Sequence, residues 1–141
     1  MKKIFVLLFA LLSLNTFAQK VEKDLKYYYY YANQEQDFTA YLKAKREFEK
    51  KKTDFKLPSS KEALKELETN QAKIFKSAKT YAEFLSRYGM TNAGEYSELW
   101  FKQMQSLKSF LKKNPDFYNL TARERQSIID KWYYADVASN D

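Results

Sequence analysis

The segment KLPSSKEALKELE, residues 56–68, marks the start of the clearest helix in the sequence. Pro58 interrupts any helix before it, and Ser59 with Glu62 three residues later has the spacing of a capping box. Apolar or small side chains then recur at alternating spacings of three and four residues until Gly89, a typical helix stop. The sequence therefore predicts one amphipathic helix over residues 60–88. Its stripe comprises Leu64, Leu67, Gln71, Ile74, Ala78, Tyr81, Leu85 and Tyr88.

Two more helices with the same signals follow toward the C-terminus. Asn92 with Glu95 predicts the start of a helix that ends before Pro115. Thr121 with Glu124 predicts the start of the last helix, whose apolar face includes Trp132.

The segment before Pro58, residues 20–56, is predicted to be a long helix that contains five consecutive tyrosines, residues 27–31. At 100° per residue, five adjacent side chains sweep about 400° of a helix, so one buried face cannot hold all of them. The apolar stripe before the tyrosines also points to a different side from the stripe after them. Two interpretations follow: the helix breaks near Asn33, which caps a new helix with Gln36 as its partner, or it continues and the tyrosines form a half-exposed collar.

The four predicted helices define an all-α fold, a mostly antiparallel four-helix bundle with a long bent first helix. Only two glycines and two prolines occur, too few for the many turns of a β-sandwich. The chain has no cysteine, so burial must hold the fold, and its 25 aromatic residues supply large apolar areas. We expect residues 19–141 to form a single helical domain.

The N-terminus has the pattern of a secretory signal peptide over residues 1–18. Lys2 and Lys3 precede an apolar run from Ile4 to Leu12, and Ala18 ends a small-x-small cleavage pattern. The run is about half of the roughly 20 residues that a membrane-spanning helix needs, which disfavours the alternative of an N-terminal membrane anchor. We therefore expect an exported protein, periplasmic or extracellular, with no transmembrane segment after cleavage.

The composition excludes several chemistries. Histidine and cysteine are absent, which removes His-based triads, thiol nucleophiles and the usual zinc ligands. Two glycines cannot build a phosphate-binding loop. Carboxylate pairs such as Glu62 with Glu66 and Glu95 with Glu98, and serines near lysines, are typical of solvated helix surfaces. We expect no enzymatic activity, no cofactor and no metal site.

Tyrosines forced to the surface are candidates for partner binding, because a large apolar ring with one polar end suits binding surfaces. The predicted site combines tyrosines of the run with Tyr134 and a basic helix end. Its residues are Tyr27, Tyr29, Tyr30, Lys50, Lys51, Lys52 and Tyr134.

The expected function is therefore binding to another protein, in the manner of an inhibitor or an immunity protein. The net charge is +7, or +5 without Lys2 and Lys3, which leaves an alternative: an envelope-surface protein that binds anionic polymer or lipid through the basic helix end. Nucleic acid is not an expected partner of an exported protein.

Overall fold

The structure is a computed structural model that describes residues 22–140, so the predicted signal peptide lies outside the described residues. From residue 22 to residue 140 the chain forms α-helices and short 3-10 turns and contains no strand. The all-α class is thus confirmed. None of the helices in this part of the chain has the length and hydrophobicity that crossing a bilayer requires.

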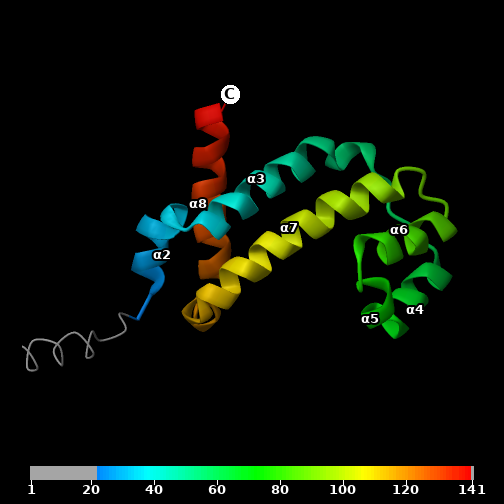
Figure 1. Ribbon diagram of the computed structural model, residues 1–141, viewed down its shortest axis with the longest axis horizontal. Helices are drawn as coiled ribbons and strands as arrows, with labels where there is room; N and C mark the ends of the chain where they lie inside the picture. The colour runs from blue at the N-terminus through cyan, green and yellow to red at the C-terminus, as the bar shows by residue number, and fades with distance from the viewer. Residues whose placement is uncertain (1–21, 141) are drawn as a thin grey trace, which may run out of the picture.

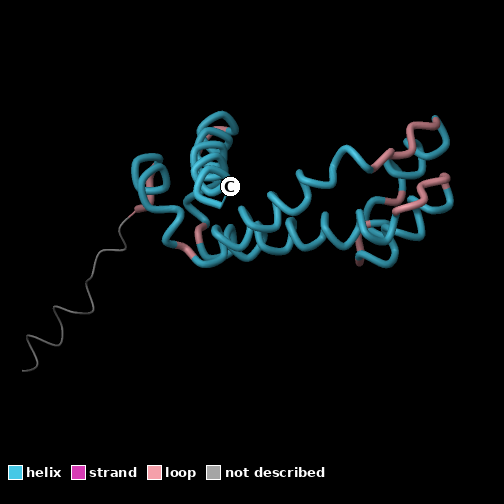
Figure 2. Tube along the Cα trace, turned by 90° about the horizontal axis from the view of Figure 1, so that it is seen from above, coloured by secondary structure: helices cyan, strands magenta, loops and turns pink. Residues whose placement is uncertain are grey.

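Two long antiparallel helices, α3 (Gln36–Lys51) and α7 (Ala93–Lys113), lie side by side and form a rod along the molecule (Figures 1 and 2). At 1.5 Å per residue they are roughly 24 and 32 Å long. Three ion pairs cross between them. These pairs are Asp37 with Lys113, Glu47 with Lys102, and Lys51 with Glu95. Because their lysine ends are mostly exposed, they fix the register of the rod more than they stabilise it.

The first core lies at the end of the rod where α3 begins and α7 ends. It is closed by α2 (Leu25–Tyr31), by the 3-10 turn η3 (Pro115–Asn119) and by α8 (Ala122–Asn140), which runs across the rod (Figures 1 and 2). The fully buried ring of Phe110 lies 5.0 Å from that of Phe38 and 5.2 Å from that of Phe117, between centroids. The buried members are Tyr28, Ala32, Phe38, Tyr41, Leu42, Phe110, Phe117, Leu120 and Ile128.

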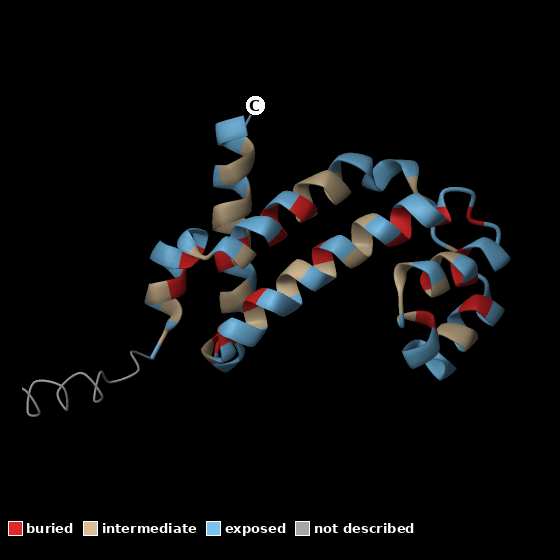
Figure 3. Cartoon of the chain, in the orientation of Figure 1, coloured by how far each residue is buried: buried red, intermediate tan, exposed pale blue. Residues whose placement is uncertain are grey.

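The second core lies at the other end, where α4 (Lys61–Thr69), α5 (Gln71–Ile74) and α6 (Ala78–Arg87) gather around the beginning of α7 (Figure 3). Tyr81 is its central ring, with Tyr96 at 5.9 Å and Trp100 at 5.3 Å between centroids. The buried members are Ala63, Ile74, Tyr81, Phe84, Leu85, Met90, Ala93 and Tyr96.

The predicted helix over residues 60–88 is wrong in its continuity, because the chain forms α4, α5 and α6 there. Ser77 has an extended backbone, its hydroxyl accepts from the N–H of Thr80, and the Thr80 hydroxyl accepts from the N–H of Ser77. Serine and threonine hydroxyls offer the backbone an alternative to helical hydrogen bonds, and here they start a new helix. The predicted stripe still places Tyr81 in the second core, whereas Leu64 is 49% exposed.

The first predicted helix is also divided, which supports the interpretation of a break after the tyrosines. α2 ends at Tyr31, and the 3-10 turn η1 (Ala32–Gln34) leads into α3. The predicted cap at Asn33 is wrong: Glu35 occupies the N-cap position of α3 without a side-chain capping bond. Within residues 22–140 there are seven α-helices where the four-helix bundle predicted four, because two of the four are divided.

Of the other predicted helix boundaries, some are confirmed and some differ in the structure. The box of Thr121 and Glu124 is confirmed by both of its hydrogen bonds. Gly89 follows the C-cap of α6 and stops that helix as expected, with a φ of 88° that favours glycine. Ser60 rather than Ser59 caps α4. Asn92 makes no side-chain capping bond, and the side chain of Glu95, its predicted partner, pairs with Lys51 across the rod instead.

The buried hydroxyl of Tyr28 yields a prediction for stability. Its ring fills the first core, but among the described residues its oxygen finds no hydrogen-bond partner, and burial raises its pKa far above the ordinary value. An unpaired buried hydroxyl is unfavourable, so Tyr28→Phe should keep or raise the free energy of unfolding, by about 1 kcal/mol. Tyr28→Ala should lower it by roughly 3–5 kcal/mol. Urea unfolding followed by circular dichroism measures both, and a clear loss in Tyr28→Phe would contradict this account.

Candidate functional site

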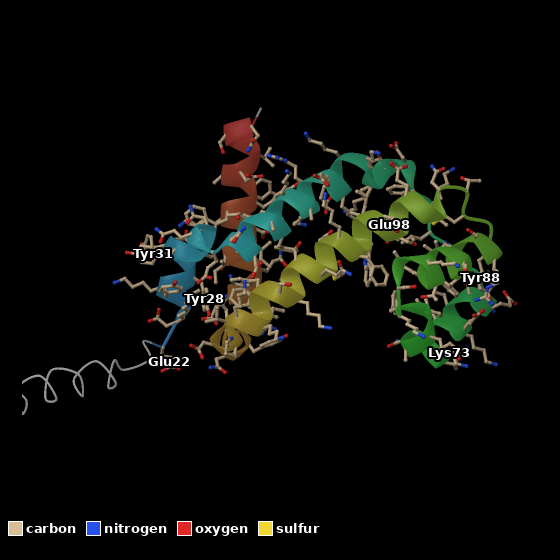
Figure 4. The ribbon with its side chains drawn as sticks, in the orientation of Figure 1. Glu22, Tyr28, Tyr31, Lys73, Tyr88 and Glu98 are labelled. Atoms are coloured by element: carbon tan, nitrogen blue, oxygen red, sulfur yellow. The ribbon has the colours of Figure 1, made fainter. Side chains whose placement is uncertain are left out.

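The tyrosine run forms most of α2, a helix of seven residues, and its rings point to different sides. Tyr28 is directed into the first core and Tyr31 lies at the outer edge of the molecule (Figure 4). Tyr27 is half-buried, while Tyr29, Tyr30 and Tyr31 are 38%, 54% and 48% exposed. The collar interpretation therefore describes α2 itself, although the helix does not continue into α3. Tyr31 was not among the predicted site residues, although its exposure follows from the same helix geometry.

A polar network holds the beginning of α2 against the rod. The Nζ of Lys23 donates to Glu35 Oε1 and to Asn114 Oδ1, each at 2.8 Å, and the Tyr27 hydroxyl donates to Glu35 Oε1 at 3.3 Å. The backbone N–H of Lys23 donates to Asp116 Oδ2 at 3.3 Å. Asn114 is buried, and its Nδ2 donates to the carbonyl of Phe110. The network thus joins α2 to the start of α3 and to the end of α7.

α8 supplies donors to the end of α2. The Nε1 of Trp132 donates to the carbonyl of Tyr28 at 3.3 Å, and the Nζ of Lys131 donates to the carbonyl of Tyr29. The carbonyl of Tyr28 also accepts the helical bond from the N–H of Ala32, so Trp132 is a second donor to it. The Lys131 nitrogen also lies 3.9 Å from the ring centroid of Tyr29 and 4.9 Å from that of Tyr30, within cation–π range. Lys131 therefore fixes the backbone and two exposed rings together.

A hollow of about 460 Å³ opens beside these rings, between α2 and α8. Its walls are mostly apolar. The lining residues are Asp24, Leu25, Lys26, Tyr29, Tyr30 and Ser127. The rings of Tyr29 and Tyr30 stand edge to face, with centroids 5.4 Å apart. A volume of this size suits a small group, such as one or two side chains of a partner.

Tyr134 lies on the same side of α8 as this hollow. It is 67% exposed, and it follows Ser127 by seven residues, which is about two helical turns. Its ring packs edge to face on Tyr133, with centroids 5.5 Å apart. The structure thus brings Tyr29, Tyr30 and Tyr134 to one side, which we name the α2–α8 surface.

The three predicted lysines lie elsewhere. Lys50 and Lys51 end α3 and Lys52 begins the 3-10 turn η2 (Lys52–Asp54), at the opposite end of the rod from α2. Lys51 pairs with Glu95, and Lys52 pairs with Glu49 at 3.4 Å. Only Lys50 of the three forms no ion pair within residues 22–140. The structure does not bring these lysines together with the tyrosines, because the length of α3 separates them.

Several carboxylates in the described part of the chain accept hydrogen bonds from side-chain donors. Wherever a shift of a carboxyl pKa is resolved there, the pKa is lowered, at Glu35, Glu47, Glu49 and Glu66. For Glu66 the main cause is the hydrogen bond from the Tyr88 hydroxyl at 2.7 Å. A carboxyl that acts as a general acid needs a raised pKa instead. No group of three metal-ligating side chains occurs in residues 22–140.

A larger open depression of about 1050 Å³ lies over α4, α5 and α6. Its wall mixes cations and carboxylates, namely Lys73, Lys79, Arg87, Glu66 and Glu83. Glu66 and Arg87 already pair with each other at 2.6 Å. Mixed charges give this depression no preference for one class of ligand, which favours the apolar hollow of the α2–α8 surface as the candidate site.

No family model matches the chain, and no significant match was found among curated proteins or solved structures.

The network at Lys23 predicts how stability depends on pH. The hydrogen bond from Lys23 lowers the pKa of Glu35 against the opposing effect of burial. For Lys23, burial lowers the pKa, but the hydrogen bond to Glu35 and the negative charge of Glu35 together outweigh burial, so the pKa of Lys23 is raised overall. A carboxyl group whose pKa is lowered by folding stabilises the fold at pH values above its pKa in the unfolded chain. This contribution is lost as the pH falls through its pKa in the folded chain. A raised lysine pKa stabilises the fold until pH rises through it.

We therefore expect Glu35→Gln to be less stable than wild type at neutral pH, with a difference that shrinks below about pH 4. Urea unfolding at several pH values measures this difference. Glu83→Gln is the matched control, because Glu83 is exposed and belongs to none of the ion pairs in the described chain. A stability gap that stayed constant from neutral to acid pH would count against the network.

Proposed function

We propose that this chain is a small exported, non-enzymatic binding protein that acts through contacts with another protein, as an inhibitor or an immunity protein does. The observation that carries the proposal is the α2–α8 surface, where the exposed rings of Tyr29 and Tyr30 line a mostly apolar hollow. Export is proposed from the signal-peptide pattern of residues 1–18.

Exposed tyrosines of this kind suit a binding surface. Tyrosine offers a large contact area with few rotatable bonds, and its hydroxyl stays satisfied by water before a partner arrives. Tyr29 and Tyr30 are also held by Lys131, so little side-chain freedom remains to be lost on binding. Rings that are exposed and already ordered are what an interface anchor requires.

The alternative of an envelope-surface protein has less support. Binding of anionic polymer or lipid through the basic helix end needs uncompensated cations, yet Lys51 and Lys52 have carboxylate partners. Lys50 alone would leave a weak attraction that physiological salt screens.

The test is a pull-down from extracts of the source organism with immobilised protein, residues 19–141, at low and moderate salt. We expect a specific protein to be retained at both salts, because apolar contacts are not screened. Tyr30→Ser should reduce its retention by about tenfold or more, as the loss of an interface anchor does.

Tyr118→Ser is the matched control, because Tyr118 is 62% exposed but lies on η3, outside the hollow. Retention that Tyr30→Ser and Tyr118→Ser leave equally unchanged would refute a tyrosine-anchored interface. Retention of polymer or lipid at low salt only, sensitive to Lys50→Gln, would favour the alternative.

A further inference from the structure

The outward face of α8 is open. In Figure 2, where this helix is seen end-on, no other described element covers the side that faces away from the rod. Ser127 lies on this face beside the hollow, and the side chains one turn before and one turn after it share the face, because residues three or four positions apart are neighbours on a helix. The open face thus carries two acids and two bases around a small central residue. They are Arg123, Glu124, Asp130 and Lys131.

These four charges remain available to a partner. None of them belongs to an ion pair within residues 22–140. Glu124 and Asp130 each accept one hydrogen bond from a neighbouring residue, and a carboxylate has further acceptor sites. Lys131 uses one of its three donors on the carbonyl of Tyr29.

The charges form two edges of the open face. At 100° per residue, Glu124 and Lys131 lie about 60° and 40° to one side of Ser127, whereas Arg123 and Asp130 lie about 40° and 60° to the other side. Along the helix axis, each edge has one charge about 4.5 Å and the other about 6 Å from Ser127, in opposite directions. Each edge therefore carries one acid and one base at nearly equal distances from the centre.

This spacing makes the face complementary to itself. A two-fold axis brings the same surface of two copies together. When two α8 helices lie antiparallel with the axis at Ser127, Lys131 of one copy meets Glu124 of the other, and Arg123 meets Asp130. We propose that the open face of α8 binds α8 of a second copy of this chain in this arrangement, with four ion pairs across the axis.

The charge of the whole chain also favours this face as the contact. The net charge is +7, or +5 without Lys2 and Lys3, so two copies repel each other unless the charges at their contact cancel. The four charges of the open face sum to zero, and opposite charges meet along each edge. This inference goes beyond the proposed function, because a dimer can form whether or not a different protein binds the hollow.

The rings beside the face set the size of the contact. Tyr134 lies two turns after Ser127, so it reaches the beginning of the second α8, and Tyr29 and Tyr30 extend the edge that holds Lys131. An aromatic side chain buries about 150–250 Å² when fully covered, so three half-exposed rings offer a few hundred Å². A stable complex covers about 800 Å² on each partner. We therefore expect a weak dimer, with a dissociation constant on the order of 100 µM.

The experiment is analytical ultracentrifugation of residues 19–141 at physiological salt, from about 10 µM to about 1 mM protein, a range that spans the expected dissociation constant. We expect the dimer fraction to rise over this range, and the dissociation constant to increase at about 1 M salt, because the ion pairs are screened. A chain that stays monomeric up to about 1 mM overturns the proposal. If that monomer still captures a partner protein, the proposed function stands and only the dimer is wrong.

Charge reversals locate the contact. Arg123→Glu places two acids opposite each other at two points of the dimer and should raise the dissociation constant by about tenfold or more, and Asp130→Arg does the same with two bases. The double variant, Arg123→Glu with Asp130→Arg, restores opposite charges and should return the dissociation constant to within about threefold of wild type. Such a recovery is the coupling expected of two positions in contact.

Lys50→Glu is the matched control, because it changes the net charge by the same amount at an exposed position toward the other end of the rod. Both Lys50→Glu and Arg123→Glu reduce the repulsion between copies, so a general charge effect would strengthen the dimer in both. We expect Arg123→Glu alone to weaken it. Circular dichroism checks that each variant is folded. Equal effects of the two variants, or a double variant without recovery, would overturn the assignment to α8.

Discussion

The contact between α3 and α7 is the interaction on which the rest of the structure depends. At one end the rings of Phe38 and Phe110 pack 5.0 Å apart, and at the other Phe48 and Tyr96 pack 5.5 Å apart, between centroids. Every other helix except α8 has ten residues or fewer in the described chain, too short to be stable alone in water. Each of these short helices gains its stability by covering one end of the rod.

The candidate site is a product of how α2 ends. At the end of this helix of seven residues, Lys131 of α8 donates to the carbonyl of Tyr29, and Trp132 adds a second donor to the carbonyl of Tyr28, which already accepts from the N–H of Ala32. The same lysine lies against Tyr29 and Tyr30, so the group that completes the helix also orders the exposed rings. One side chain therefore both bonds the helix backbone and orders the exposed rings. This explains how a short helix can present a defined aromatic surface.

The sequence predicted the helical class and some of the helix boundaries, whereas it revealed none of the contacts between distant segments. The all-α class, the Thr121 box and the stop at Gly89 depend on neighbouring residues, and they are confirmed. The break at Ser77 was missed because Thr80 replaces the usual Glu or Gln of a capping box. The contact of Lys131 with Tyr29 joins residues 102 positions apart, and no periodicity reveals it. The separation of Lys50–Lys52 from the tyrosines follows from α3 lying straight between them.

The two cores share none of their buried residues, and this has a consequence for how the sequence can change over time. Substitutions in distant, independent sites have additive effects, so α4, α5 and α6 can accept new side chains without altering the geometry at α2 and α8. Residues of the first core support both the fold and the aromatic surface and are therefore constrained twice. Relatives of this chain should diverge fastest at the end built from α4 to α6, with the tyrosine-bearing end as the slowly varying part.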